Sequence, residues 1–166
     1  PYRAHPPEPA CQADARLGCG ACHGGEPRAL TARVAHAMPG GSGPDPLMKP
    51  PHVQAACYRC HVPGAVAGTE RLAAGAQRYL QLGCPVCHPL ALGGKGGAAF
   101  GPDLRAVGRR SLRYLTDSLI EPTANFAGSS MPSFERTLVD HPEVLTDLLI
   151  YLQALALEPL LDCAPA

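Results

Sequence analysis

Three short motifs of cysteine and histidine constrain this 166-residue chain more than any other feature of its sequence. In each motif two cysteines stand three positions apart, and a histidine follows the second one directly. The motifs are Cys19-Gly-Ala-Cys22-His23, Cys57-Tyr-Arg-Cys60-His61 and Cys84-Pro-Val-Cys87-His88. Histidine supplies only 7 of the 166 residues, so coincidence would rarely place one after all three pairs.

Other uses of paired cysteines account for these motifs less well. A zinc site of four cysteines takes two such pairs, which would leave the third pair and all three histidines unexplained. A thioredoxin-like redox pair needs one pair beside a βαβ pattern, and the sequence has no run of β-branched strands. A disulfide framework suits the even number of cysteines, which is 8, but such closely spaced pairs are poor disulfide partners in three separate copies.

The remaining interpretation is the covalent attachment of haem. Two thiols three positions apart can form thioether bonds to the two vinyl groups on one porphyrin edge, while the adjacent imidazole binds the iron as its proximal ligand. We therefore expect three covalently bound haems of the c type. Their attachment residues would be Cys19, Cys22, Cys57, Cys60, Cys84 and Cys87, and their proximal ligands His23, His61 and His88.

The composition suits a chain whose interior is partly filled by a cofactor. Apolar residues make up 46% of the chain, yet it has no tryptophan, only 3 phenylalanines and 5 tyrosines. Proline and glycine contribute 19 and 18 residues, which predicts long irregular loops. No run of 18 or more apolar residues occurs, so we expect no membrane-spanning segment.

Helical periodicity is confined to the second half of the chain. Apolar or small residues recur at a helical interval in 70–83, directly before the third motif. Ser111 is a suitable N-cap for a second helix that ends at Pro122. A third helix should begin at residues 140–142 and present a wide apolar face. The apolar positions assigned to the first two helices include Leu72, Tyr79, Leu80, Leu112, Leu115 and Leu119. The expected fold is mostly α-helical with long irregular loops.

Residues 69–157 resemble the single-haem, class I cytochrome c domains, in which a helix precedes the attachment motif and two helices follow it. Gly101-Pro102-Asp103-Leu104 is similar to the family's loop in which the proline carbonyl accepts a hydrogen bond from the proximal imidazole, so the resemblance implies that Pro102 orients His88. Ser130-Met131-Pro132-Ser133-Phe134 is similar to the family's distal loop, which implies that Met131 is the sixth ligand of the third iron.

The same resemblance implies a close crossing of the first and last helices of this half. Gly75 and Tyr79 stand at that position on one helix, and Tyr151 and Leu152 on the other. The sequence then divides into a loop-rich segment with two haems at 1–66, a cytochrome c-like domain at 69–157 and a tail at 158–166.

Residues 1–66 carry two motifs but almost no helical periodicity between them. In this they resemble the compact multihaem cytochromes, in which loop histidines supply the sixth ligands. His36 and His52 lie between the two motifs and are the expected distal ligands, although the sequence leaves open which of them serves which haem. Met38 and Met48 are the alternatives.

Four other residues suggest roles outside the motifs. Cys11 and Cys163 would form a disulfide in an oxidising compartment, or remain as thiols. His5, on a proline-rich arm, could bind a haem of a neighbouring copy and so build a filament. His141 is most simply a residue at the start of a helix.

An iron with two protein ligands has no open position for a substrate, so we expect electron transfer and not enzymatic catalysis. The alternatives are a small multihaem reductase or peroxidase, which needs a five-coordinate iron, and a haem-based sensor with a displaceable ligand. Axial methionine raises the reduction potential relative to two histidines. We therefore expect two low-potential haems in the first half of the chain and one of higher potential in the second.

Charge and context indicate the kind of partner. Lysine and arginine number 14, as do aspartate and glutamate, and neither half of the chain is basic enough to predict nucleic-acid binding. The expected partners are redox proteins, including a membrane complex or other cytochrome subunits. The sequence begins at Pro1 without a signal peptide, and we expect an exported protein, periplasmic or extracellular, whose signal peptide has been removed.

Overall fold

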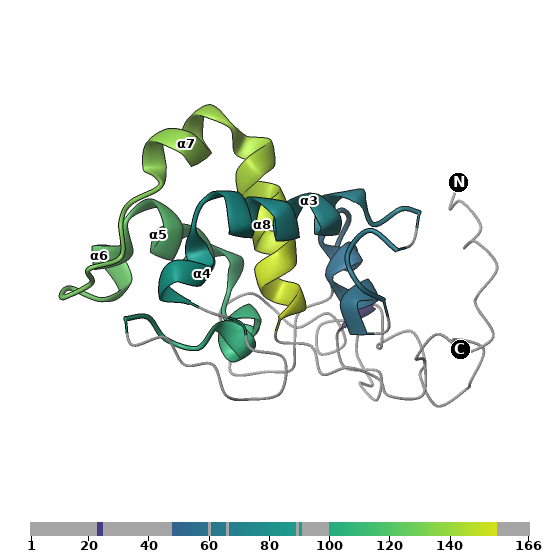
Figure 1. The fold of residues 1–166 in the computed structure, drawn as a ribbon, viewed down its shortest axis with the longest axis horizontal. Helices are drawn as coiled ribbons and strands as arrows, with labels where there is room; N and C mark the ends of the chain where they lie inside the picture. Colours follow the sequence, from purple (N-terminus) through teal and green to yellow (C-terminus); the bar gives the residue numbers. More distant parts are fainter. Residues whose placement is uncertain are drawn as a thin grey trace, which may run out of the picture.

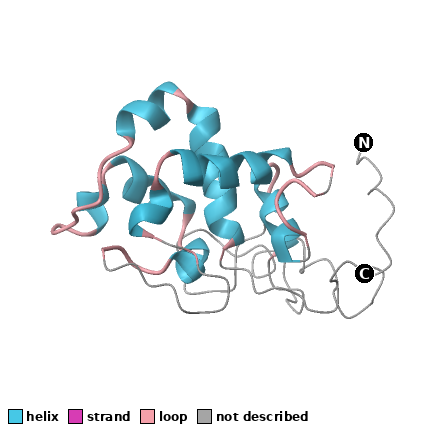
Figure 2. Cartoon of the chain, viewed as in Figure 1, coloured by secondary structure: helices cyan, strands magenta, loops and turns pink. Residues whose placement is uncertain are grey.

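The computed structural model describes residues 23–24, 48–59, 61–65, 67–88, 90 and 100–155. Within these ranges every regular element is a helix and there is no strand (Figure 2), which agrees with the predicted helical class. The elements are η1 (His52–Arg59), α3 (Glu70–Gln81), α4 (Cys84–Cys87), η2 (Leu104–Arg109), α5 (Leu112–Ile120), α6 (Pro122–Asn125), α7 (Glu135–Asp140) and α8 (Pro142–Ala154). The predictions for His5, Cys11, Cys19, Cys22, His36, Met38, Cys60, Cys163 and the tail at 158–166 lie outside the described residues.

Helix α8 is the centre of the fold, and α3 crosses it closely (Figure 1). Gly75 lies at the crossing point: a Cβ atom there would be 2.1 Å from the Asp147 carbonyl oxygen and 2.8 Å from the Tyr151 Cβ atom. Since carbon and oxygen atoms cannot approach so closely, the two helix backbones can meet only because this residue is glycine. The close crossing predicted at Gly75 is present.

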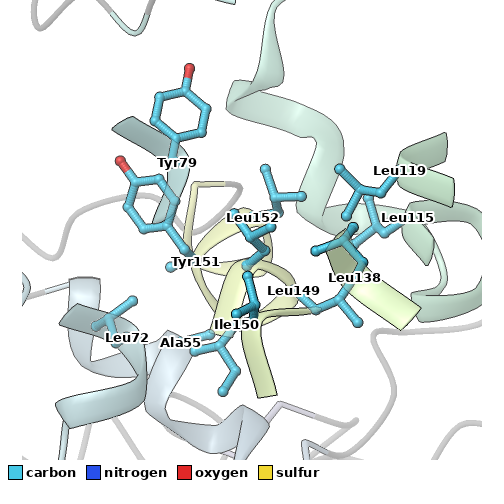
Figure 3. Packing of buried hydrophobic residues seen from close by; sticks show 13 residues of the cluster. Ala55, Leu72, Tyr79, Leu115, Leu119, Leu138, Leu149, Ile150, Tyr151 and Leu152 are labelled. Atoms are coloured by element: carbon cyan, nitrogen blue, oxygen red, sulfur yellow. The ribbon is translucent and has the colours of Figure 1, made fainter. Parts of the chain in front are cut away.

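The hydrophobic core surrounds α8 on several sides. Figure 3 shows Leu72 and Tyr79 of α3 on one side of this helix, and Leu115, Leu119 and Leu138 on the other. Ala55 of η1 belongs to the same core and is completely buried. The η1 helix, which precedes residue 66, therefore shares one core with helices of the second half.

The three long helices lie where the sequence predicts them, with some differences in detail. Helix α3 ends at Gln81, slightly before the predicted end, because Gly83 has a left-handed φ of 75° that breaks the helix. Leu80 was assigned to the buried face but is 66% exposed, since it follows Tyr79 and points about 100° away from it around the helix. Leu112, in the first turn of α5, is 38% exposed for its part, while Leu115 and Leu119 are buried.

The helix starts agree with the predicted capping residues. The Ser111 hydroxyl accepts a hydrogen bond from the Tyr114 N–H at 3.2 Å, which satisfies one of the unpaired donors of α5. His141 is the N-cap of α8, and Pro142 opens its first turn. Pro122 follows α5 as expected, but it also begins the short helix α6. None of the helices in the described ranges is long and apolar enough to span a membrane.

Candidate functional site

The third cysteine motif forms a single helical turn. Gly83 turns the chain sharply after α3, and Pro85 is compatible with the first turn of α4. Because residues three apart share one face of a helix, this turn places Cys84 and Cys87 side by side. The His88 N–H donates to the Cys84 carbonyl at 2.8 Å and closes the turn. Burial raises the pKa of the Cys84 thiol, and the neighbouring Cys87 adds to the effect.

The side chain of His88 is held in one orientation. Its Nδ1 atom lies 2.8 Å from the Pro102 carbonyl oxygen. Since a carbonyl oxygen can only accept, Nδ1 must carry the proton, and the lone pair of Nε2 is then available to a metal. The hydrogen bond predicted between these two residues is present.

Gly101 makes this arrangement possible. A Cβ atom at this position would lie 2.6 Å from the Cε1 and Nδ1 atoms of His88 and 2.7 Å from the Cys87 carbonyl oxygen. Any larger side chain would push the loop off the imidazole. His88 itself is only 9% exposed, so the loop and α3 cover most of it.

Three tyrosines connect the third motif to the second. The Tyr79 hydroxyl donates a hydrogen bond to the His88 carbonyl oxygen, and its ring centroid is 5.4 Å from that of Tyr151. Tyr151 in turn meets Tyr58 edge to face, with centroids 6.3 Å apart. Tyr58 stands between the two cysteines of the second motif, so these three tyrosine rings run from the third cysteine motif to the second. Burial raises the pKa of Tyr79, with smaller contributions from Cys84 and Tyr151.

The second motif begins in η1, which is fixed to the helical core. Cys57 is part of this helix, and the His61 N–H donates to the Cys57 carbonyl oxygen at 2.9 Å. The Gln54 Oε1 atom accepts hydrogen bonds from the N–H groups of Arg71 (3.0 Å) and Leu72 (3.2 Å). These N–H groups lie in the first turn of α3 and have no partner within that helix. A side chain of η1 thus caps the helix that leads to the third motif.

The predicted ligand His52 occupies the first turn of η1 and is partly buried. Its Nδ1 atom lies 2.7 Å from the Oε1 atom of Gln153, which is 101 residues away in the sequence. The Met48 N–H donates to the carbonyl oxygen of His23 at 2.7 Å, so the segment that leads into η1 lies beside His23.

Met131 lies in the loop between α6 and α7, where it is partly buried and packs against the hydrophobic core. Its N–H donates to the Ser129 hydroxyl at 3.2 Å. The loop is fastened to the end of α5 by the Phe134 N–H, which donates to the Leu119 carbonyl at 2.9 Å, and by the Ser133 hydroxyl, which donates to that of Ile120.

No family model, curated protein or solved structure matches this chain. The structure unites Cys84, Cys87, His88 and Pro102 in one compact site, and it joins His52 to the C-terminal end of α8.

Sequence reasoning missed Gln54, Tyr58 and Gln153. The position of Tyr58 inside a cysteine motif was a signal that could have drawn attention to it. The two glutamines carry no local signal, because each makes a contact that depends on the tertiary fold.

Proposed function

We propose that this protein is a trihaem c-type cytochrome that transfers electrons and has no catalytic activity of its own. The observation that carries the proposal is the third motif: two thiols on one helical turn, followed by an imidazole whose Nδ1 faces a carbonyl oxygen at 2.8 Å. This arrangement would leave Nε2 of His88 to bind a haem iron, and Cys84 and Cys87 would hold the porphyrin. It supports a cytochrome c-like domain at 69–157.

The ligand set follows from the sequence motifs. His23, His61 and His88 would be the proximal ligands, and His36, His52 and Met131 the distal ones. Bound haem iron supplies one-electron chemistry by alternating between its ferric and ferrous states. With two side-chain ligands for each iron, the residues of this chain would exclude substrates from the iron and leave only electron exchange.

Contacts between the motifs favour transfer inside the molecule. The Tyr58–Tyr151 ring contact and the η1 contacts hold the second motif against α8, and Tyr79, which meets both Tyr151 and His88, links the third motif to the same helix. Two haems attached there would be near neighbours at a fixed spacing. The direction of transfer would run from the low-potential haems of the first half to the higher-potential haem beside Met131.

The proposal also includes the cellular location of the protein and its partners. Stable thioether-linked haem suits an exported protein in the periplasm or outside the cell. Its partners would be redox proteins, as a free carrier or as a subunit of a respiratory, photosynthetic or extracellular electron-transfer assembly.

The proposal is tested by producing the chain together with a haem-attachment system and counting haems by pyridine haemochrome analysis and intact mass. We expect three haems per chain, all low-spin in electron paramagnetic resonance. His88→Ala should turn one haem high-spin. His141→Ala, which removes an exposed histidine at the start of α8, should leave all three low-spin. Fewer than three haems in the wild-type protein would contradict the proposal.

A further inference from the structure

We infer that Gln153 is a positioning residue for the axial ligand His52, an inference that rests on the proposed function. The Oε1 atom of Gln153 lies 2.7 Å from the Nδ1 atom of His52. A carboxamide oxygen can only accept, so Nδ1 carries the proton and donates it. The imidazole is thereby kept in the tautomer whose Nε2 lone pair is open to an iron.

His52 and His88 share this feature although they belong to different parts of the chain. His88 directs Nδ1 at the Pro102 carbonyl at 2.8 Å, and His52 directs Nδ1 at the Gln153 carboxamide at 2.7 Å. An acceptor for the nitrogen that faces away from the metal is the usual outer partner of a histidine ligand. His141 differs, because it is exposed and its Nδ1 faces the Glu143 carboxylate at 3.5 Å.

Both sides of the His52 contact are anchored. On one side, η1 is held by buried Ala55 and by the Gln54 carboxamide, which caps α3. On the other side, Gly108 of η2 fits against the backbone of Gln153: a Cβ atom there would be 2.5 Å from the Gln153 carbonyl oxygen. Because η1 and the end of α8 are both held in place, the imidazole of His52 has little freedom to rotate.

The position of Gln153 in its helix also favours a hydrogen-bond donor beside its side chain. It is the penultimate residue of α8, where the carbonyl end of the helix carries partial negative charge. A hydrogen-bond donor such as the Nδ1–H group of His52 therefore suits this end of the helix.

The consequence is that the last helix of the third haem's domain controls a haem carried by the first half of the chain. The segment from Gly101 to η2 is connected with both acceptors: it contains Pro102, and its Gly108 packs against the backbone of Gln153. Neighbouring parts of the same segment would thus orient both histidines.

Two variants of opposite chemistry test this role. In Gln153→Glu the acceptor becomes an anion, which draws the Nδ1 proton more strongly and makes the imidazole a better donor to ferric iron. The reduction potential of one haem should fall. In Gln153→Met the acceptor is lost at similar length, so the potential of the same haem should rise. Its affinity for carbon monoxide should increase by roughly 10- to 100-fold as His52 binds less firmly.

Three controls make the result specific. Gln77→Met, on an exposed position of α3, should leave all three potentials unchanged. His52→Ala should open the same haem to carbon monoxide, and adding Gln153→Met to it should have no further effect. Haem content is measured in every variant, so that attachment and tuning are read separately.

The outcomes separate this inference from the proposed function. Fewer than three haems in the wild-type protein would overturn both. Three haems with potentials that stay fixed, or that move in the same direction in Gln153→Glu and Gln153→Met, would overturn the inference alone, because a purely structural glutamine predicts no opposite shifts.

Discussion

The sharpest test of the site is to add one carbon atom at Gly101. The new Cβ atom of Gly101→Ala would be 2.6 Å from two ring atoms of His88, whereas ordinary contacts begin at 3.4 Å. The loop and the imidazole must therefore separate by 0.8 Å, the difference between these distances. The distance between the His88 Nδ1 atom and the Pro102 carbonyl oxygen is 2.8 Å. The same movement would increase this distance to about 3.6 Å, which is outside the range of a hydrogen bond.

The expected loss of stability follows from three contributions. The lost hydrogen bond costs about 1 kcal/mol, and forcing an extra carbon into a packed site costs roughly 1–3 kcal/mol. The unfolded state of the alanine variant has a lower conformational entropy, which offsets about 0.4–1 kcal/mol of this destabilisation. The free energy of unfolding should thus fall by about 1–3.6 kcal/mol. For a chain of this size that corresponds to a decrease in Tm of roughly 2–14 °C.

Thermal unfolding followed by circular dichroism measures this change, and Gly128→Ala is the matched control. Gly128 is exposed, and its nearest neighbours to an added Cβ atom, in the Phe126 ring, begin at 3.6 Å. This control should keep or slightly raise the Tm. With the proposed haem bound at the third motif, Gly101→Ala should also raise the reduction potential of that haem, since His88 would be a weaker donor to its iron. If Gly101→Ala melts at or above the temperature of Gly128→Ala, the close fit against His88 is refuted.

Two further predictions concern α8. Gly75→Ala would place a Cβ atom 2.1 Å from the Asp147 carbonyl oxygen. This clash should outweigh the gain of about 1 kcal/mol in helix propensity, so the free energy of unfolding measured in urea should fall by roughly 2 kcal/mol. An unchanged unfolding midpoint would argue against the close helix crossing. Burial, with a smaller effect of Tyr58, raises the pKa of Tyr151 to about 12. The protonated phenol therefore contributes stability that is complete below pH 10 and is lost as the pH rises from 10 to about 12. In Tyr151→Phe the free energy of unfolding should decrease less steeply over this pH range. An identical pH profile in the variant and the wild-type protein would contradict this prediction.

The sequence predicted the long helices well because their apolar periodicity is a local property. The N-cap at Ser111 and the first turn at Pro142 depend on short-range chemistry, and both are present. The one-turn helix α4 was not predicted, since four residues cannot display a period. Its position depends on the left-handed turn at Gly83.

The site was predictable only in part. The cysteine motifs and the hydrogen bond from His88 to Pro102 were accessible, the first from spacing and the second from a family resemblance. The contact between His52 and Gln153 spans 101 residues and follows from how η1 docks on α8. No local pattern encodes such a contact, and the same is true of the capping of α3 by Gln54.

The carboxamide of Gln54 has a consequence for how the protein can be divided. A fragment beginning at residue 69 would lose the acceptor for the N–H groups of Arg71 and Leu72 and would uncover the part of α8 that Ala55 protects. Its first helix would fray at the end farthest from the third motif. An engineer who wishes to isolate the C-terminal helical region should therefore begin the fragment before η1, or supply a new N-cap and a polar surface in its place.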